Sequence, residues 1–321
     1  MEDNIIFKRI YKFLSKEVVD NEILPKWDEP HRFYHNRTHL YDVLDQIFKS
    51  DIKNNLNVDI LVVSAFFHDI IYNPKKQNNE QKSVDYLNEF KEIPENIREK
   101  ASKIIMDTSL NEPPKDHLSN LFWLFDRNIF YKDLTELIQY ENNIFKEFQY
   151  VPYDVYKEKR IEFLKTCIGV YNKDVDQNIK SLISYIDSRK PSVGIYAGSF
   201  NPFHIGHKDV LEKANKIFDK VIIAFGNNPD KPKNELFVPE CIQFYQIESY
   251  DTLITDFIDK IQNQGVETTL IRGIRNGADL RHRTRTAFRD VKEIAHGNRP
   301  AGIYRKPGNV LYHHKDTHIN N

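Results

Sequence analysis

The spacing of apolar residues changes abruptly near residue 189, and this change limits what the chain can fold into. Upstream of it, apolar side chains recur at intervals of three or four residues, for example at Leu40, Leu44 and Ile47. This is the period with which one face of an amphipathic helix meets a core. A dense apolar run over residues 59–72 is typical of a buried helix. We therefore predict that the first part of the chain is a helical bundle.

Downstream of residue 189 the pattern becomes that of an α/β fold. Short apolar runs that are typical of strands occur at 193–197, 220–225 and 267–271, and a helix is predicted over 249–263. Strands that alternate with helices imply a parallel sheet with crossover connections. The predicted domains are an all-α bundle over residues 1–189 and a Rossmann-like α/β domain over residues 190–321.

Length, charge and cysteine content restrict the class of protein further. A chain of 321 residues is too long for one ordinary core, and its 40% hydrophobic residues are ample for two. The formal net charge of −1 gives no general attraction to nucleic acid, and no apolar run approaches the length of a membrane span. Cys167 and Cys241 match no disulfide or metal-site spacing, and the first residues lack the apolar core of a signal peptide. We expect a cytoplasmic protein with no membrane or nucleic-acid partner, and homo-oligomerisation stays open.

Two ionisable residues interrupt the buried helix predicted over residues 59–72. His68 and Asp69 follow a mostly apolar stretch, and burying both without a partner would be costly. His39, at the start of another predicted helix, and Asp126, at the end of a third, add the same ligand types. Neutral imidazole and carboxylate suit a divalent metal. The alternative is a bundle whose core histidines are hydrogen-bonded to aspartates.

These residues lie in segments that resemble a known family. Residues 31–130 are similar to the HD superfamily of metal-dependent phosphohydrolases, in the branch with a Tyr-His-Asn-x-x-His-Leu segment. Four segments carry this resemblance. They are 34–40 (YHNRTHL), 66–72 (FFHDIIY), 79–83 (NEQKS) and 125–129 (FDRNI).

The resemblance implies an HD-type bundle that hydrolyses a phosphoester with a divalent transition metal, which would be Mn, Fe, Zn or Ni. Glu80 or His35 would then shuttle protons or hold phosphate. Arg32 would neutralise phosphate charge beside them. The metal ligands that the resemblance implies are His39, His68, Asp69 and Asp126.

The decapeptide at residues 198–207, GSFNPFHIGH, predicts a phosphate site. It follows the strand predicted at 193–197 and precedes an amphipathic run. A strand that ends in a glycine turn and leads into a helix leaves backbone N–H groups that can bind phosphate. His204 and His207 flank Gly206, so donor or cationic groups stand beside the phosphate, and the glycine lets a ligand approach closely.

The decapeptide resembles the His-x-Gly-His motif of the nucleotidyltransferase superfamily. Within that superfamily, residues 193–280 look like the phosphopantetheine adenylyltransferases, because three blocks match in order. The blocks are 198–207, then 218–222 (FDKVI) with 227–231 (NNPDK), and finally 271–279 (IRGIRNGAD).

This second resemblance implies transfer of the adenylyl group of ATP, accompanied by Mg²⁺, to the phosphorylated acceptor 4′-phosphopantetheine. The products would be dephospho-coenzyme A and pyrophosphate. His204 and His207 would hold phosphates and developing charge, and Lys231 would clamp the acceptor phosphate. Arg272 and Arg275 would face the same crevice at the carboxyl ends of the strands. The implied nucleotide-binding residues are Gly198, Ser199, Phe200, Gly206, His207, Arg272, Gly273 and Arg275.

Three alternatives stay open. In the first, the fold is unchanged but the acceptor is nicotinamide mononucleotide or the phosphate of a cytidylyl-type alcohol. In the second, the α/β domain is a degenerate ATP-binding module that regulates the hydrolase. The basic sequence after Arg272, with Arg283 where a glutamate is expected, favours that hypothesis. In the third, the HD-type half is the inert one.

Overall fold

The computed structural model describes residues 3–200, 202–226, 238–274 and 310–313. The chain divides into two compact units. One unit comprises Met1–Glu147 with Lys159–Asp187, and the other comprises Phe148–Glu158 with Ser188–Asn321. The sequence prediction put all of residues 1–189 in one domain, whereas the structure groups Phe148–Glu158 with the sheet.

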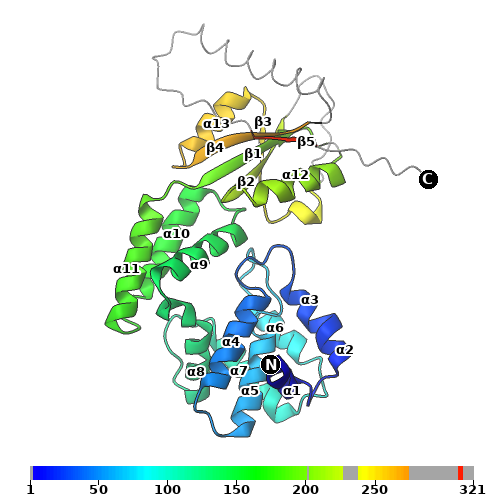
Figure 1. The fold of residues 1–321 in the computed structure, drawn as a ribbon, viewed down its shortest axis with the longest axis vertical. Coiled ribbons are helices and arrows are strands. Elements are labelled where there is room, and N and C mark those ends of the chain that lie inside the picture. The colour runs from blue at the N-terminus through cyan, green and yellow to red at the C-terminus, as the bar shows by residue number, and fades with distance from the viewer. Residues whose placement is uncertain (1–2, 201, 227–237, 275–309, 314–321) are drawn as a thin grey trace, which may run out of the picture. The chain divides into compact units, whose positions relative to one another are not determined.

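The chain before residue 189 is helical, as the apolar spacing predicted (Figure 1). Within the described residues, no helix is both long enough and apolar enough to cross a membrane. A π-helical turn, Val19–Ile23, and a 3₁₀ turn, Asn128–Tyr131, lie between α-helices. The α-helices are α1 (Asp3–Ile10), α2 (Lys16–Val18), α3 (Leu24–Trp27), α4 (Arg37–Lys49), α5 (Asn55–Phe67), α6 (Asn79–Leu87), α7 (Glu95–Asp107), α8 (His117–Asp126), α9 (Leu134–Glu147), α10 (Tyr153–Thr166) and α11 (Lys173–Ser188).

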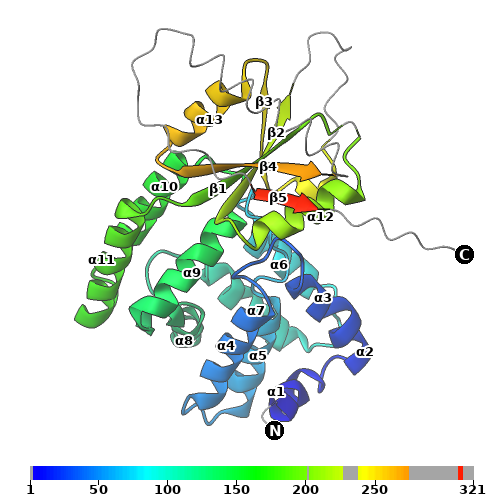
Figure 2. The same cartoon turned by 45° about the horizontal axis from the view of Figure 1, so that its top comes forward.

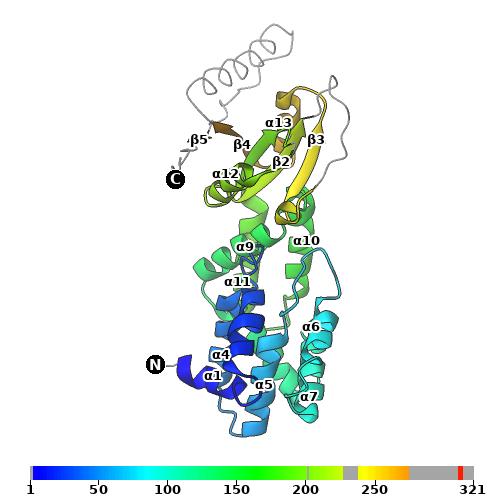
Figure 3. The same ribbon diagram turned by 90° about the vertical axis from the view of Figure 1, so that its right-hand side faces the viewer.

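Helix α5 forms the centre of the first unit. Its sequence is apolar on all sides, so it is buried among its neighbours rather than along one face. Figure 3 shows it between α4 and α7, against both of which it packs. Asn54 caps its first turn, and the indole of Trp27 donates a 3.1 Å hydrogen bond to the Phe66 carbonyl near its last turn. Both ends of the helix are therefore fixed.

The second unit contains a parallel sheet in the order β3-β2-β1-β4-β5 (Figure 2), which confirms the predicted parallel α/β fold. In the central strand, Ile195 lies opposite Ile222 on one side and Leu270 on the other. The strands are β1 (Ser192–Gly198), β2 (Lys220–Gly226), β3 (Gln246–Tyr250), β4 (Glu267–Ile274) and β5 (Val310–His313).

The helix predicted over 249–263 is wrong at its start. Gln246–Tyr250 is strand β3, and helix α13 runs only over Ile254–Gln262. Strand β3 lies at the edge of the sheet, where its polar residues need not alternate strictly with buried ones. This polarity concealed the strand from a search for apolar runs.

Helix α12 (Ile205–Asn215) and helix α13 lie on opposite faces of the sheet (Figure 1). Helix α12 connects β1 to β2 on one side of β1, whereas α13 carries the chain to β4 on the other side. The strand order therefore reverses between β1 and β4. In parallel sheets, ligands bind in the crevice outside the carboxyl ends of the strands at such a reversal.

The segment before α10 is attached to the start of β2. The side chain of Gln149 accepts a 3.3 Å hydrogen bond from the Val221 amide, and Lys220 Nζ donates to the Val151 carbonyl. Only 1% of Lys220 is exposed, and burial lowers the pKa of its ammonium to about 7, against weaker opposing effects of Glu248 and Asp154. A buried lysine thus attaches this segment to the sheet.

The pKa of Lys220 predicts a pH-dependent stability. In the unfolded chain this lysine keeps its proton up to about its ordinary pKa of 10.5, but in the folded chain only to about 7. The unfolded state therefore binds more protons between these values, and the free energy of unfolding should rise with pH across that window. Urea titrations at several pH values across this window measure the free energy of unfolding. Its rise with pH should be smaller in Lys220→Met and unchanged in the surface variant Lys216→Met. An unchanged slope in Lys220→Met would contradict the assignment.

Candidate functional site

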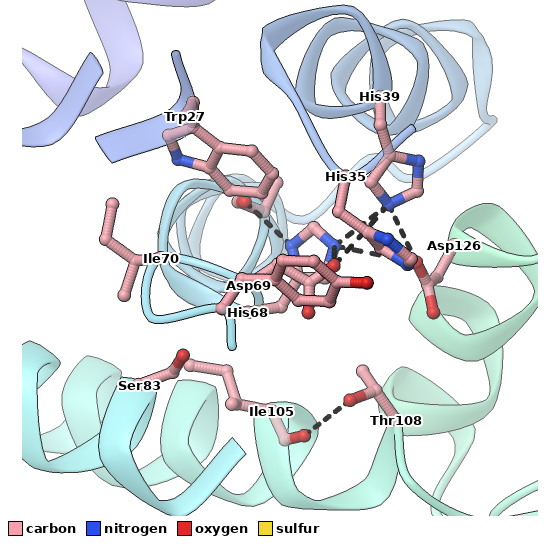
Figure 4. Close-up of polar contacts among 12 residues, drawn as sticks. Trp27, His35, His39, His68, Asp69, Ile70, Ser83, Ile105, Thr108 and Asp126 are labelled. Carbon is pink, nitrogen blue, oxygen red and sulfur yellow. Dashed lines mark hydrogen bonds and ion pairs between the residues drawn. The ribbon is translucent and has the colours of Figure 1, made fainter. Parts of the chain in front are cut away.

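The four predicted metal ligands converge in the first unit. His39 comes from the first turn of α4, His68 and Asp69 follow α5, and Asp126 ends α8. His39 Nε2 lies 3.1 Å from both His68 Nε2 and Asp126 Oδ1. His68 Nε2 lies 3.3 Å from Asp69 Oδ2 and 3.5 Å from Asp126 Oδ1. Figure 4 shows these side chains pointing at one another, and we call them the metal-ligand cluster.

The end of α5 explains how adjacent residues reach one point. Successive side chains on a helix diverge by about 100°. Helix α5, however, ends at Phe67, and His68 is its C-cap, with its amide donating a 2.8 Å bond to the Ser64 carbonyl. Asp69 therefore lies in the turn beyond the helix, and its carboxylate reaches the same point as the His68 ring.

The two carboxylates of the cluster favour positive charge beside them. His68 Nδ1 lies 2.9 Å from the Ala65 carbonyl, to which it must donate, so Nε2 of the neutral ring offers a lone pair to the cluster. Although burial lowers the pKa of His68, the carboxylates of Asp69 and Asp126 raise it to about 9. Burial likewise opposes ionisation of Asp126, but hydrogen bonds from His39 and His68 hold its pKa well below the usual value.

The donor set fits a divalent transition metal. Two imidazole nitrogens and two carboxylate oxygens are ligands that Mn, Fe, Zn and Ni accept. His39 and His68 are almost fully buried, whereas Asp69 and Asp126 keep 19% and 18% of their side chains exposed. A ligand can therefore approach the cluster from its carboxylate side.

Arg32 does not have the role expected of it. Its side chain is fully buried, and it donates to the Glu29 carboxylate and to backbone carbonyls. Two of those carbonyls, at 2.7 and 3.1 Å, belong to Asp69 and Ile70, and a third belongs to His35. The guanidinium thus holds the turn that carries Asp69, and its donors are already used by the protein.

Glu80 and His35 differ in their positions. Glu80 lies in the first turn of α6, and its carboxylate has no hydrogen bond or ion pair with the described residues. The His35 ring lies beside the metal-ligand cluster, with its centroid 5.8 Å from that of His39. Figure 4 shows His35 beside the ligands.

Glu147, the last residue of α9, was not singled out from the sequence. Its Oε1 accepts hydrogen bonds from the amides of Tyr34 and His35 at 2.7 and 2.8 Å. Its Oε2 lies 2.6 Å from both His35 Nδ1 and the Tyr72 hydroxyl. Burial opposes ionisation, yet His35 and these hydrogen bonds lower the pKa of Glu147 to about 2. The same carboxylate outweighs burial and raises the pKa of His35.

The second candidate site lies where β1 leads into α12. His204 is the N-cap of α12, and its Nδ1 accepts a 3.1 Å hydrogen bond from the Gly206 amide. His207 Nδ1 in turn accepts a 3.2 Å bond from the His204 amide. The two rings stack with centroids 3.7 Å apart. Because both Nδ1 atoms accept hydrogen bonds, the neutral rings carry their protons on Nε2.

The turn before α12 is tightly shaped. Phe200 has a φ of 41°, an unusual value for a residue other than glycine, and its buried ring packs against His207 at 5.1 Å. A Cβ on Gly198 would lie 3.0 Å from the Phe200 ring, and a Cβ on Gly206 would lie 3.1 Å from the His204 ring. A side chain at either position would therefore push the neighbouring ring by a few tenths of an ångström, so both glycines permit a close approach here.

The other predicted nucleotide-site residues are only partly described. Ser199 is exposed beside Phe200 at the end of β1. Arg272, on the neighbouring strand β4, donates from Nη1 to the Ala197 carbonyl at 3.4 Å, which places it at the same end of the sheet. Gly273 follows it in β4. Lys231 and Arg275 lie outside the described residues.

Comparison with known proteins bears on the α/β unit. Residues 195–259 match the cytidylyltransferase-like family. This part of the chain is nucleotidyltransferase-like. The chain is 38% identical over 101 residues to a phosphopantetheine adenylyltransferase from Porphyromonas gingivalis, which covers 29% of this chain and 64% of that protein. The corresponding values for the enzyme from Clostridium kluyveri are 31% over 111 residues, 32% and 65%, and for that from Streptococcus pneumoniae 28% over 128 residues, 35% and 76%. The chain thus spans slightly less than two thirds of the first two relatives.

Two substitutions of His204 distinguish its capping of α12 from any other role of its ring. His204→Ala removes the acceptor for the Gly206 amide and should cost about 1 kcal/mol at the start of α12. His204→Asn keeps a capping oxygen and should lose only a small part of that. Amide hydrogen exchange of α12 measures this difference. Equal exchange in the two variants would contradict the capping role.

Proposed function

We propose that the α/β unit transfers the adenylyl group of ATP to 4′-phosphopantetheine. The observation that carries this proposal is the backbone-bonded pair His204 and His207 at the start of α12, with Arg272 bonded to the Ala197 carbonyl near the end of β1. The pair lies at the carboxyl end of β1, where the strand order reverses, and the similarity to phosphopantetheine adenylyltransferases supports the choice of reaction.

The residues suit a reaction that depends on positioning. In phosphoryl and nucleotidyl transfer, the protein mainly aligns the reactants and stabilises negative charge. The Nε2–H groups of His204 and His207 would donate to phosphate oxygens, since their Nδ1 atoms are held by the backbone. Arg272 would add a fixed positive charge from β4. Mg²⁺ bound with ATP would supply further charge neutralisation at the phosphates. Lys231 and Arg275 complete the proposed set of cations.

A pyrophosphate-release assay tests this function. With ATP, Mg²⁺ and 4′-phosphopantetheine, the wild-type protein should release pyrophosphate, and His207→Ala should reduce the rate by a factor on the order of 10² or more. His204→Asn should also lose activity although it retains the cap. His117→Ala, which changes an exposed histidine at the start of α8, is the matched control and should leave the rate unchanged.

The outcome also separates the alternatives. Release only with nicotinamide mononucleotide, or only with CTP and an alcohol phosphate, would contradict the proposed acceptor. ATP binding without pyrophosphate release from any acceptor would contradict transfer and favour a regulatory ATP-binding module. The absence of both binding and release would reject both functions of this unit.

We further infer that the helical unit is an HD-type phosphohydrolase. The metal-ligand cluster supports this second function, because its ligand atoms come from three parts of the chain and lie close together. His39 Nε2 and His68 Nε2 lie 3.1 Å from each other and 3.1–3.9 Å from the carboxylate oxygens of Asp69 and Asp126. A divalent metal held there would act as a Lewis acid toward a phosphoester and lower the pKa of a water. The protein itself orients the ligands through Ala65 and Arg32, which bond His68 and the Asp69 turn.

Metal analysis of purified protein tests the helical unit. Protein prepared without chelator should carry about one equivalent of Mn, Fe, Zn or Ni. Asp126→Asn should lose most of this metal, because it removes one charge from the donor set. Asp116→Asn, at the opposite end of α8, should retain it, since asparagine also caps a helix. Equal metal content in the two variants, or none in the wild type, would contradict the assignment.

A further inference from the structure

Glu147 has a bonding pattern that helix packing alone does not require. Its side chain is fully buried, and each oxygen accepts two hydrogen bonds. One oxygen fixes the main chain at Tyr34 and His35, while the other receives His35 Nδ1 and the Tyr72 hydroxyl. The carboxylate thus controls both where the His35 backbone lies and how its ring is turned.

The His35 ring is held on a second side by Tyr72. The two rings stack with centroids 4.5 Å apart and planes inclined by 29°. Stacking on Tyr72 therefore limits how far the imidazole plane can tilt. The hydrogen bond to Glu147 fixes the direction in which Nδ1 points within that plane. With Nδ1 bonded, Nε2 forms the remaining polar edge, and it has no hydrogen-bond partner among the described residues.

Accessibility separates the roles of the two groups. The His35 side chain keeps 23% of its surface exposed, whereas that of Glu147 keeps none. His35 also lies beside His39, a member of the metal-ligand cluster, and Glu147 lies behind it on α9. A ligand at the cluster can therefore touch His35 but not Glu147.

We propose that Glu147 is a positioning residue, which together with Tyr72 orients His35 so that its Nε2 edge contacts the phosphoryl group of a phosphoester bound at the metal-ligand cluster. This inference rests on the proposed hydrolase function. A carboxylate that accepts from Nδ1 fixes the ring and stabilises positive charge on it, which allows Nε2–H to donate to a phosphoryl oxygen. His35 would be the residue that touches substrate.

Helix α9 offers a matched control for this role. Glu141 lies on the same helix, is fully buried like Glu147, and pairs with Arg160 Nε at 2.8 Å. The ring of Tyr140 covers that arginine, so the pair stabilises packing between α9 and α10. Glu141→Gln thus removes an equally buried charge without touching His35.

The test uses the full-length, Mn²⁺-loaded protein with p-nitrophenyl phosphate as substrate and inorganic phosphate as inhibitor. Glu147→Gln and His35→Asn should each lower kcat/KM by about 10- to 100-fold and weaken phosphate inhibition, with metal content unchanged. The double variant should be no worse than either single variant, because both remove one interaction. Glu141→Gln should stay within about twofold of the wild type, and Tyr72→Phe, which leaves the Glu147–His35 bond, should fall between them.

A spectroscopic readout keeps the inference testable without turnover. In ¹⁵N-histidine spectra, the Nδ1–H of His35 should be strongly hydrogen-bonded in the wild type and in Glu141→Gln, and this signal should be lost in Glu147→Gln. Two results would overturn the positioning role. One is a loss of kcat/KM in the double variant equal to the product of the losses in the two single variants, and the other is an unchanged His35 signal in Glu147→Gln. A wild-type protein that hydrolyses nothing but shows the expected spectra would overturn the proposed hydrolase and leave the orientation of His35 by Glu147 supported.

Discussion

A hydrogen bond at Nδ1 determines which edge of His68, His204 and His207 is presented to a ligand. In the helical unit, the Ala65 carbonyl accepts the Nδ1–H of His68, so Nε2 faces His39 and the carboxylates of Asp69 and Asp126. In the α/β unit the polarity is reversed, because backbone amides donate to Nδ1 of His204 and His207 and the protons lie on Nε2. The first arrangement suits a metal and the second suits phosphate. The backbone thereby assigns opposite chemistry to the same side chain.

Both sites lie where regular structure stops. Helix ends leave unsatisfied amides and carbonyls, and strand ends in a parallel sheet open onto a crevice. The termination of α5 at Phe67 lets His68 and Asp69 turn to the same point. The end of β1, with Phe200 at positive φ, lets α12 begin with a histidine cap. In each unit the buried core fixes the element, and the element's end carries the chemistry.

Much of this arrangement is visible in the sequence, because local signals carry it. The helical region and the parallel sheet follow from apolar spacing. The resemblance to the HD superfamily implied that His39, His68 and Asp126 share one site, and the structure brings them together. Glu147 could not be found this way, since it lies 112 residues from His35 and looks like an ordinary residue of an amphipathic helix. The role of Arg32 also depends on contacts between distant parts of the chain. It donates to the backbone carbonyls of Asp69 and Ile70, and because every residue has such a carbonyl, the sequence alone does not identify these partners.

The central proposal is that the backbone bonds at Nδ1 of His204 and His207 leave their Nε2–H edges to donate to the phosphates of a nucleotide. Long-range ¹⁵N–¹H spectra of histidine-labelled protein, recorded with and without Mg²⁺ and ATP, test this most directly. The account predicts that at neutral pH both rings carry their proton on Nε2 and that these Nε2 resonances shift when the nucleotide binds. Protons on Nδ1, or Nε2 resonances whose chemical shifts do not change at saturating nucleotide, would contradict it.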